Sequence, residues 1–170
     1  MAVTTITVAA ADDIPFILTC IRDLAAFERL AHEVVATEAR LQDALCGPRP
    51  LAHAVIARVD GAPVGFALWF YNFSTFTGLP GLYLEDLYVQ PAWRRQGIGR
   101  ALLTHLAATA VAQGCARMEW SVLDWNADAI AVYRALGAVP MDDWTVQRLT
   151  GDALRACASG AATAPPRSAP

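Results

Sequence analysis

Residues 84–103 read LEDLYVQPAWRRQGIGRALL. An apolar run ends at Val89, a short loop follows, and Gly97 and Gly99 open a segment whose apolar residues have helical spacing. This order predicts a strand, a loop and a helix over residues 97–113, which Gly114 would terminate. Glycines at the mouth of a helix leave backbone N–H groups uncovered at the positive end of the helix dipole. The loop therefore predicts a site for phosphate or pyrophosphate.

Two common phosphate-binding motifs do not fit this loop. A dinucleotide fingerprint needs a third glycine three residues after the second, where this chain has Leu102. A Walker A loop needs a lysine, and all 13 basic residues here are arginine. A lone Gly-x-Gly pair is about equally compatible with a simple helix cap, so the ligand has to be identified from further residues.

The flanking sequence predicts a single sheet with helices, which is a mixed α/β fold class. Asp60-Gly61 is the turn of a hairpin, and Thr37 begins a short helix that ends at Gly47-Pro48. Asp12 or Asp13 caps a helix with an apolar stripe from Ile14 to Ala25. The predicted order is βααβββαβαβ. A short first strand lies around Ile6 and Val8, and a helix covers residues 126–136. The other predicted strands cover residues 52–59, 64–71, 82–89, 117–122 and 144–149.

Composition bounds the class of protein. The chain has 170 residues, of which 55% are apolar and 17% charged, so it predicts one globular domain. We place this domain in residues 1–157 and predict a flexible Ala/Pro-rich tail over residues 158–170. The net charge of −3 gives no basic surface for a phosphate backbone, which disfavours a nucleic-acid partner.

The four cysteines and three histidines are scattered along the chain. No Cys-x-x-Cys pair or other ligand spacing is present, so no metal site is predicted. The cysteines are typical of small buried hydrophobes in a reducing compartment. We find no signal-peptide pattern and no apolar run long enough to span a bilayer, and we expect a cytoplasmic protein without a membrane partner.

Several segments resemble the Gcn5-related N-acetyltransferase (GNAT) family. Arg94-x-x-Gly97-x-Gly99 is similar to the family's acetyl-CoA pyrophosphate signature, and residues 125–138 (WNADAIAVYRALGA) resemble its second motif. Residues 24–28 (LAAFE) and 82–86 (LYLED) resemble the branch of spermidine/spermine (diamine) and thialysine N-acetyltransferases. The resemblance covers nearly the whole globular part. It implies the GNAT fold, with a largely antiparallel mixed sheet flanked by helices.

The resemblance also implies acetyl-CoA as cosubstrate and no metal. It implies a bulge near residues 87–89, where free backbone groups would pair with the pantetheine arm. The residues that it assigns to the cofactor are Leu87, Tyr88, Val89, Arg94, Arg95, Gln96, Gly97, Ile98, Gly99, Arg100, Asn126 and Ala129.

Asn126 and Tyr133 are seven residues apart, so they lie on one face of a helix whose natural N-cap is Asn126. An arbitrary helical tyrosine is more often a core residue. In the family, however, the tyrosine at this position protonates the departing thiolate, which a phenol that keeps its proton at neutral pH can do. The resemblance thus makes Tyr133 the catalytic acid.

Glu85 and Asp86 lie inside an apolar strand, where acids are unfavourable. The resemblance implies that Glu85 faces the substrate and helps to deprotonate its ammonium, directly or through water. Phe27 and Glu28 resemble a substrate-amine contact, and the alternative for Glu28 is a solvated carboxylate at a helix end. An isolated acid at either strand position would more often pair with an arginine.

The predicted function is transfer of acetyl from acetyl-CoA to a primary amine of a small molecule by direct attack. Polyamine enzymes carry an acid and a tryptophan in the loop before the catalytic strand, where this chain has residues 74–78 (STFTG). That departure favours a smaller amine or an amino acid. The resemblance implies a homodimer. The alternatives are acetylation of a protein amine and a non-catalytic acyl-CoA-binding module.

Overall fold

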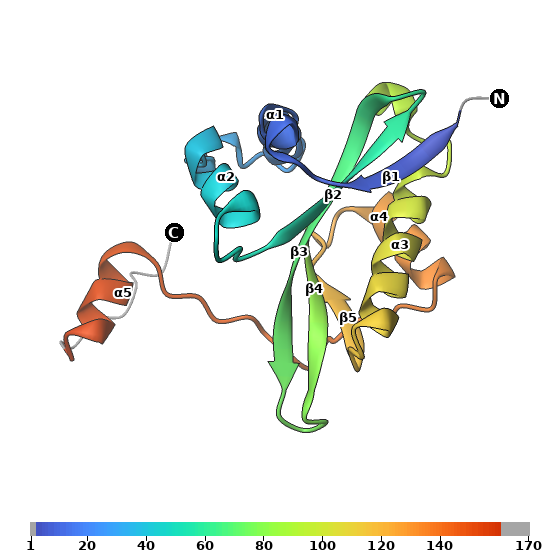
Figure 1. Ribbon diagram of the computed structural model, residues 1–170. Coiled ribbons are helices and arrows are strands. Elements are labelled where there is room, and N and C mark those ends of the chain that lie inside the picture. The colour runs from blue at the N-terminus through green and yellow to red at the C-terminus, as the bar shows by residue number, and fades with distance from the viewer. Residues whose placement is uncertain (1–2, 161–170) are drawn as a thin grey trace. The chain divides into compact units, whose positions relative to one another are not determined.

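The computed structural model describes residues 3–160, and the chain divides into two compact units, residues 1–132 and 133–170. The first unit holds a five-stranded sheet in the order β1-β2-β3-β4-β5. All neighbours are antiparallel except β4 and β5, which are parallel. The elements are β1 (Thr4–Val8), α1 (Ile14–Phe27), α2 (Glu38–Cys46), β2 (His53–Val59), β3 (Ala62–Ser74), β4 (Leu79–Val89), α3 (Ile98–Ala112), β5 (Arg117–Trp120) and α4 (Ala127–Ala135), the last of which crosses the boundary (Figure 1).

The hairpin of β2 and β3 forms as the sequence predicts. Val59 pairs with Ala62, so Asp60 and Gly61 alone make the turn. Their φ angles are +48° and +85°, the left-handed conformation that a type I′ turn needs at both central positions. Glycine carries no steric cost there, and aspartate is among the residues that tolerate it best.

Helices cover the two faces of the sheet separately (Figure 1). On one face, α1 buries its apolar stripe against β2, β3 and β4. On the other, the first turn of α3 packs on β4: an added Cβ on Gly99 would lie 3.9 Å from the side chains of Leu87 and Val89. Alternation along β4 explains the division, since successive side chains point to opposite faces. The core on the α1 face consists of Ile14, Ile17, Cys20, Ala54, Ile56, Phe66, Leu68 and Tyr88.

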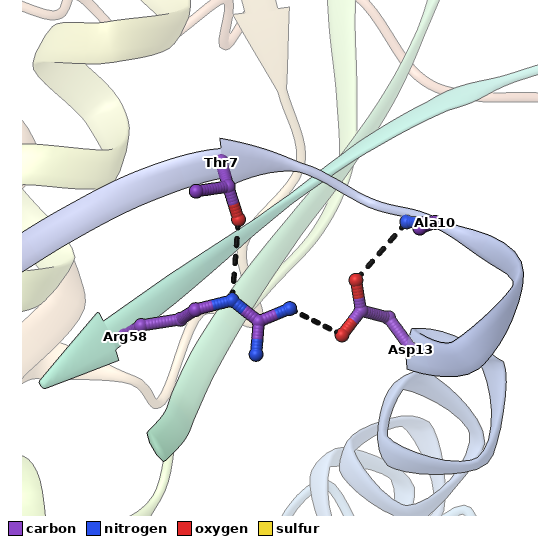
Figure 2. Close-up of polar contacts among 4 residues, drawn as sticks. All are labelled: Thr7, Ala10, Asp13 and Arg58. Carbon is purple, nitrogen blue, oxygen red and sulfur yellow. Dashed lines mark hydrogen bonds and ion pairs between the residues drawn. The ribbon is translucent and has the colours of Figure 1, made fainter. Parts of the chain in front are cut away.

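An ion pair fixes the start of α1 against β2 (Figure 2). Arg58 donates to the carboxylate of Asp13, which is only 7% exposed, and also to the hydroxyl of Thr7 at 3.3 Å. The second oxygen of Asp13 accepts the amide of Ala10 at 3.0 Å. Asp13 was predicted as a candidate helix cap, but its side chain turns back to the preceding turn and makes no cap hydrogen bond to α1. Its buried charge is therefore paired rather than isolated.

The C-terminal segment differs from the sequence prediction. Residues 144–149 form no strand in the described part of the chain, and a helix that was not predicted, α5 (Gly151–Ala158), follows them. Residues 144–147 alternate between apolar and polar side chains, which is typical of a strand with one buried face. A strand also needs a neighbouring strand to pair with, and the local pattern does not provide one. The predicted tail begins inside this helix at Ala158, and residues 161–170 of the tail lie outside the described residues.

Candidate active site

A break in the sheet exposes one edge of β4. The parallel pairing with β5 runs from Gly81 opposite Arg117 to Leu84 opposite Trp120, where β5 ends. From Glu85 to Val89, β4 has no strand neighbour on that side among the residues that the structure describes. Its backbone groups are therefore available to an extended ligand that would add to the edge like a strand.

The bulge in β4 lies at Glu85. Leu68 pairs with Asp86 and Trp69 pairs with Leu84, so Glu85 has no partner in β3. The expected position near residues 87–89 was wrong by about two residues. The physical reason is packing, because Leu87 and Val89 fit against the start of α3, whereas a carboxylate tolerates a position without a cross-strand neighbour.

Two residues of the exposed edge point their backbone groups away from β3. The amide of Gln90 donates to the carbonyl of Val64 at 2.9 Å. Because backbone groups alternate in direction along a strand, those of Gln90 and Tyr88 point toward β3. The backbone groups of Leu87 and Val89 then face the open side, whereas those of Tyr88, which was also predicted to contact the cofactor, do not. The carbonyl of Val89 accepts Nε of Arg94 at 2.9 Å, which leaves the two amides as the donors of this edge.

The loop between β4 and α3 has the geometry of an anion site. Arg95 and Gly97 both have positive φ, at +61° and +82°. The first helical hydrogen bond of α3 runs from the amide of Ala101 to the carbonyl of Gly97 at 2.9 Å, so the three preceding amides have no intrahelical acceptor. An added Cβ on Gly97 would meet no atom within 4 Å, so open space lies beside the loop. These features fit a pyrophosphate at the positive end of a helix.

The other loop residues have different surroundings. Ile98 is 2% exposed and packs in the core, so only its amide could reach a ligand. The side chain of Gln96 donates to the carbonyl of Ala92 at 3.3 Å. Arg95 and Arg100 are exposed and can supply positive charge at the mouth of the helix.

The start of α4 is capped as predicted. The side-chain oxygen of Asn126 accepts the amide of Ala129 at 3.3 Å, and its carbonyl accepts the amide of Ile130 at 3.1 Å. The cap occupies the Ala129 amide, so the predicted cofactor contact of that residue could not use it. Tyr133 lies further along α4 and is the first residue of the second unit.

Three carboxylates gather where β4 and β5 part. Asp86 is half-buried, and its pKa is raised to about 6, mainly by burial and further by the charges of Glu85 and Glu28. Burial also raises the pKa of Glu28, at the C-terminal end of α1. Glu85 is exposed. A carboxylate with a pKa near 6 is a better proton acceptor at neutral pH than an ordinary one, since efficiency rises as the pKa approaches the working pH.

The raised pKa of Asp86 predicts a pH-dependent loss of stability. The pKa rises from 3.8 to about 6 on folding, so the native state holds the proton more tightly and stability falls as pH rises between these values. We expect Asp86→Asn to raise the free energy of unfolding by about 1–3 kcal/mol at pH 7.5 and to change it much less at pH 4. Urea unfolding at the two pH values measures this. An equal effect at both would contradict the assignment.

Aromatic rings and an arginine lie beside the carboxylates. The ring centroids of Phe27 and Trp125 are 5.5 Å apart. The guanidinium carbon of Arg94 lies 5.6 Å from the centroid of Phe27 and 5.2 Å from that of Tyr88. Phe27 and Trp125 line an open depression of about 340 Å³ together with residues 126–128.

Asp86 and Trp125 lie at this candidate site, and neither was predicted from the sequence. For Asp86 the available signal was its adjacency to Glu85, but the position of the bulge decides which acid is half-buried. For Trp125 the available signal was a large aromatic residue directly before a helix cap. Its approach to Phe27 joins residues 98 positions apart, which no local pattern shows.

Two features are absent from the described residues. No group of three or more His, Cys, Asp or Glu side chains in residues 3–160 could hold a metal ion. Within the same part of the chain, no helix has the length and apolarity needed to cross a membrane.

Comparison with known proteins identifies the family. A family model described as "Acetyltransferase (GNAT) family" matches residues 19–138. Thialysine N-epsilon-acetyltransferase of Mus musculus is 37% identical over 166 residues, which cover 91% of this chain and 97% of that protein. L-ornithine N5-acetyltransferase of Arabidopsis thaliana is 33% identical over 196 residues, covering 89% and 86%. Both matches confirm the branch that the sequence resembles.

Solved structures share the fold. An integron cassette protein from the mobile metagenome of V. cholerae superposes with a TM-score of 0.75 at 23% identity, covering 91% of this chain and 97% of that one. An aminoglycoside acetyltransferase from an uncultured soil metagenomic sample gives 0.69 at 22% identity, covering 87% and 95%. The exposed edge of β4, the loop before α3 and these matches lead to one conclusion: the chain belongs to the GNAT family of acetyltransferases and is an acyltransferase that uses the family's cosubstrate, acetyl-CoA.

Proposed function

We propose that this enzyme transfers acetyl from acetyl-CoA to a primary amine of a small molecule, such as a diamine, a polyamine or a basic amino acid. The observation that carries the proposal is the position of the half-buried Asp86, with Glu85 and Glu28, where β4 leaves β5. Three carboxylates attract an ammonium group, and the open edge beside them suits the extended arm of the cosubstrate. The relatives named for thialysine and ornithine support an amino-acid acceptor.

The main chain would hold the cosubstrate. The amides at the start of α3 would bind the pyrophosphate, and the exposed arginines of the loop would add charge. The amides of Leu87 and Val89 would hold the pantetheine arm along β4. An amide of this edge would also polarise the thioester carbonyl, as donors of an oxyanion hole do. Asn126 would contribute from the cap of α4.

The reaction needs one proton acceptor and one proton donor. The acceptor amine arrives as an ammonium ion and gives its proton to Glu85, directly or through water, or to Asp86, whose pKa is raised to about 6. The uncharged nitrogen attacks the carbonyl carbon, the carbon–sulfur bond breaks, and the nitrogen gives up its second proton, which replaces the one that Tyr133 supplies to the sulfur. Tyr133 then protonates the sulfur. This last role rests on the family resemblance and on the spacing of α4.

A panel of acceptors tests the substrate class. We expect thialysine, ornithine and short diamines to release thiol from acetyl-CoA with a kcat/KM a few times that of spermine, because residues 74–78 offer no carboxylate to a distant ammonium. An exposed contact of that kind contributes about 0.2–1 kcal/mol, so the preference is modest. A much higher kcat/KM for spermine would overturn this reading. Turnover of peptides alone would favour the protein acetyltransferase, and CoA binding without turnover the binding module.

We further propose a cytoplasmic homodimer. The dispersed cysteines favour a reducing compartment, and the described cysteines are all free. The dimer rests on resemblance to the polyamine branch. Sedimentation at tens of micromolar is expected to give twice the 18.2 kDa of one chain, and a clean monomer would refute it.

A further inference from the structure

The depression at the start of α4 has the chemistry of a cation site. It is lined by Phe27 and by residues 125–128, and Asp128 is the only charged residue of these five. Phe27 is 44% exposed and Trp125 is 54% exposed, although both rings are large and apolar. The N-terminus of α4 disfavours a cation, but the carboxylate of Asp128 in its first turn offsets that dipole.

Phe27 already contacts one cation. The guanidinium of Arg94 lies over its ring at 5.6 Å, while Trp125 approaches the same ring at 5.5 Å with an interplanar angle of 54°. Aromatic faces attract cations at such distances, and tryptophan does so best. Arg94 is also held by the carbonyl of Val89 and does not line the depression, where parts of both rings remain exposed to a ligand.

Phe27 of this aromatic pair is adjacent in sequence to one of the three carboxylates. Glu28 follows Phe27 at the end of α1, and its charge acts on Asp86. A small amine whose reacting nitrogen lies at Asp86 would thus place its other end near the rings of Phe27 and Trp125. A volume of about 340 Å³ is in the range of small-molecule sites.

We propose that Trp125, paired with Phe27, is a specificity-determining residue that binds the non-reacting, cationic end of the acceptor through the faces of the two rings. This inference rests on the proposed function and adds to it the residue that selects among amines. The rings recognise positive charge on an alkyl chain without needing N–H donors. A quaternary ammonium therefore satisfies them as well as a primary one.

The test compares three acceptors of equal chain length: pentylamine, 1,5-diaminopentane and (5-aminopentyl)trimethylammonium. In the unaltered enzyme, both cation-tailed acceptors are expected to have a higher kcat/KM than pentylamine. Trp125→Leu should reduce the ratio of their kcat/KM to that of pentylamine about 2- to 5-fold, the contribution of an exposed cation–π contact. Trp125→Phe, which keeps a ring, should retain most of it. Trp144→Leu, the same substitution at a tryptophan that is 73% exposed in the segment before α5, should leave it unchanged.

Two results would overturn the inference. The first is an unchanged ratio in Trp125→Leu. The second is the absence of any preference for the trimethylammonium compound over pentylamine in the unaltered enzyme, which would assign recognition to hydrogen bonds that a primary ammonium donates to Asp128. Binding of the same compound, followed by an NMR titration of the protein, separates the two proposals. Binding that weakens 2- to 5-fold in Trp125→Leu without any acetylation would contradict the proposed function alone.

Discussion

Tyr133→Phe is expected to lower kcat about 10²-fold or more, the usual contribution of a positioned general acid. The substitution removes one hydroxyl and keeps the ring, so folding and CoA affinity should barely change. The loss should appear equally in kcat and kcat/KM, because protonation of the leaving thiolate matters only in the transition state. Steady-state kinetics with the best acceptor measure it.

A matched variant and a pH profile separate this acid from the base. Tyr71→Phe removes a hydroxyl from a tyrosine on β3 and should keep full turnover. For Glu85→Gln and Asp86→Asn, the loss of kcat/KM relative to the unaltered enzyme should shrink as pH rises, since an amine that is already uncharged needs no proton acceptor. If Tyr133→Phe retains near-normal turnover, the tyrosine is structural and another group protonates the sulfur.

Gly97→Asp is expected to abolish the protection that CoA gives against heating. A ligand present at 100 times its Kd adds about 2.7 kcal/mol to the free energy of unfolding, which raises Tm by roughly 5–10 °C in a chain of this size. The added carboxylate would lie beside the pyrophosphate, and a like-charge contact costs several kcal/mol. A thermal melt with and without millimolar CoA measures the change.

Gly97→Asn is the matched control for this variant. Asparagine has nearly the same size as aspartate, tolerates the φ of +82° comparably well, and carries no charge. A Cβ at this position meets no atom within 4 Å, so both variants should fold. Gly97→Asn should keep most of the CoA shift. Equal loss in both variants would show that the backbone conformation, and not the charge, explains the effect.

Elements with a local determinant could be predicted from the sequence. Asp60-Gly61 requires two left-handed residues and therefore a tight hairpin, and the structure confirms it. Thr37 caps α2 through its side chain, which accepts the amide of Arg40. The helix expected from Gly97 begins one residue later, with Gly97 as the N-cap of α3. In each case a few neighbouring residues determine the backbone.

Features that depend on distant partners could not be predicted. The strand expected over residues 144–149 had the right alternation, but pairing requires a neighbouring edge, which the local pattern does not specify. The bulge depends on how β3 packs opposite β4. The half-buried state of Asp86 depends on that bulge and on the end of α1, which lies 58 positions away at Glu28. Family resemblance supplied the roles of residues, whereas the burial of particular acids came from the fold.

The most direct test of the account follows both products of one reaction. The enzyme is incubated with ornithine and with acetyl-CoA that carries an isotopic label in the acetyl group, and free thiol and labelled small molecules are measured together by mass spectrometry. The account predicts one labelled N-acetyl amine for each thiol released, with no product when either substrate is omitted. Thiol release without a labelled amine, or label found only on protein, would contradict acetyl transfer to a small-molecule amine.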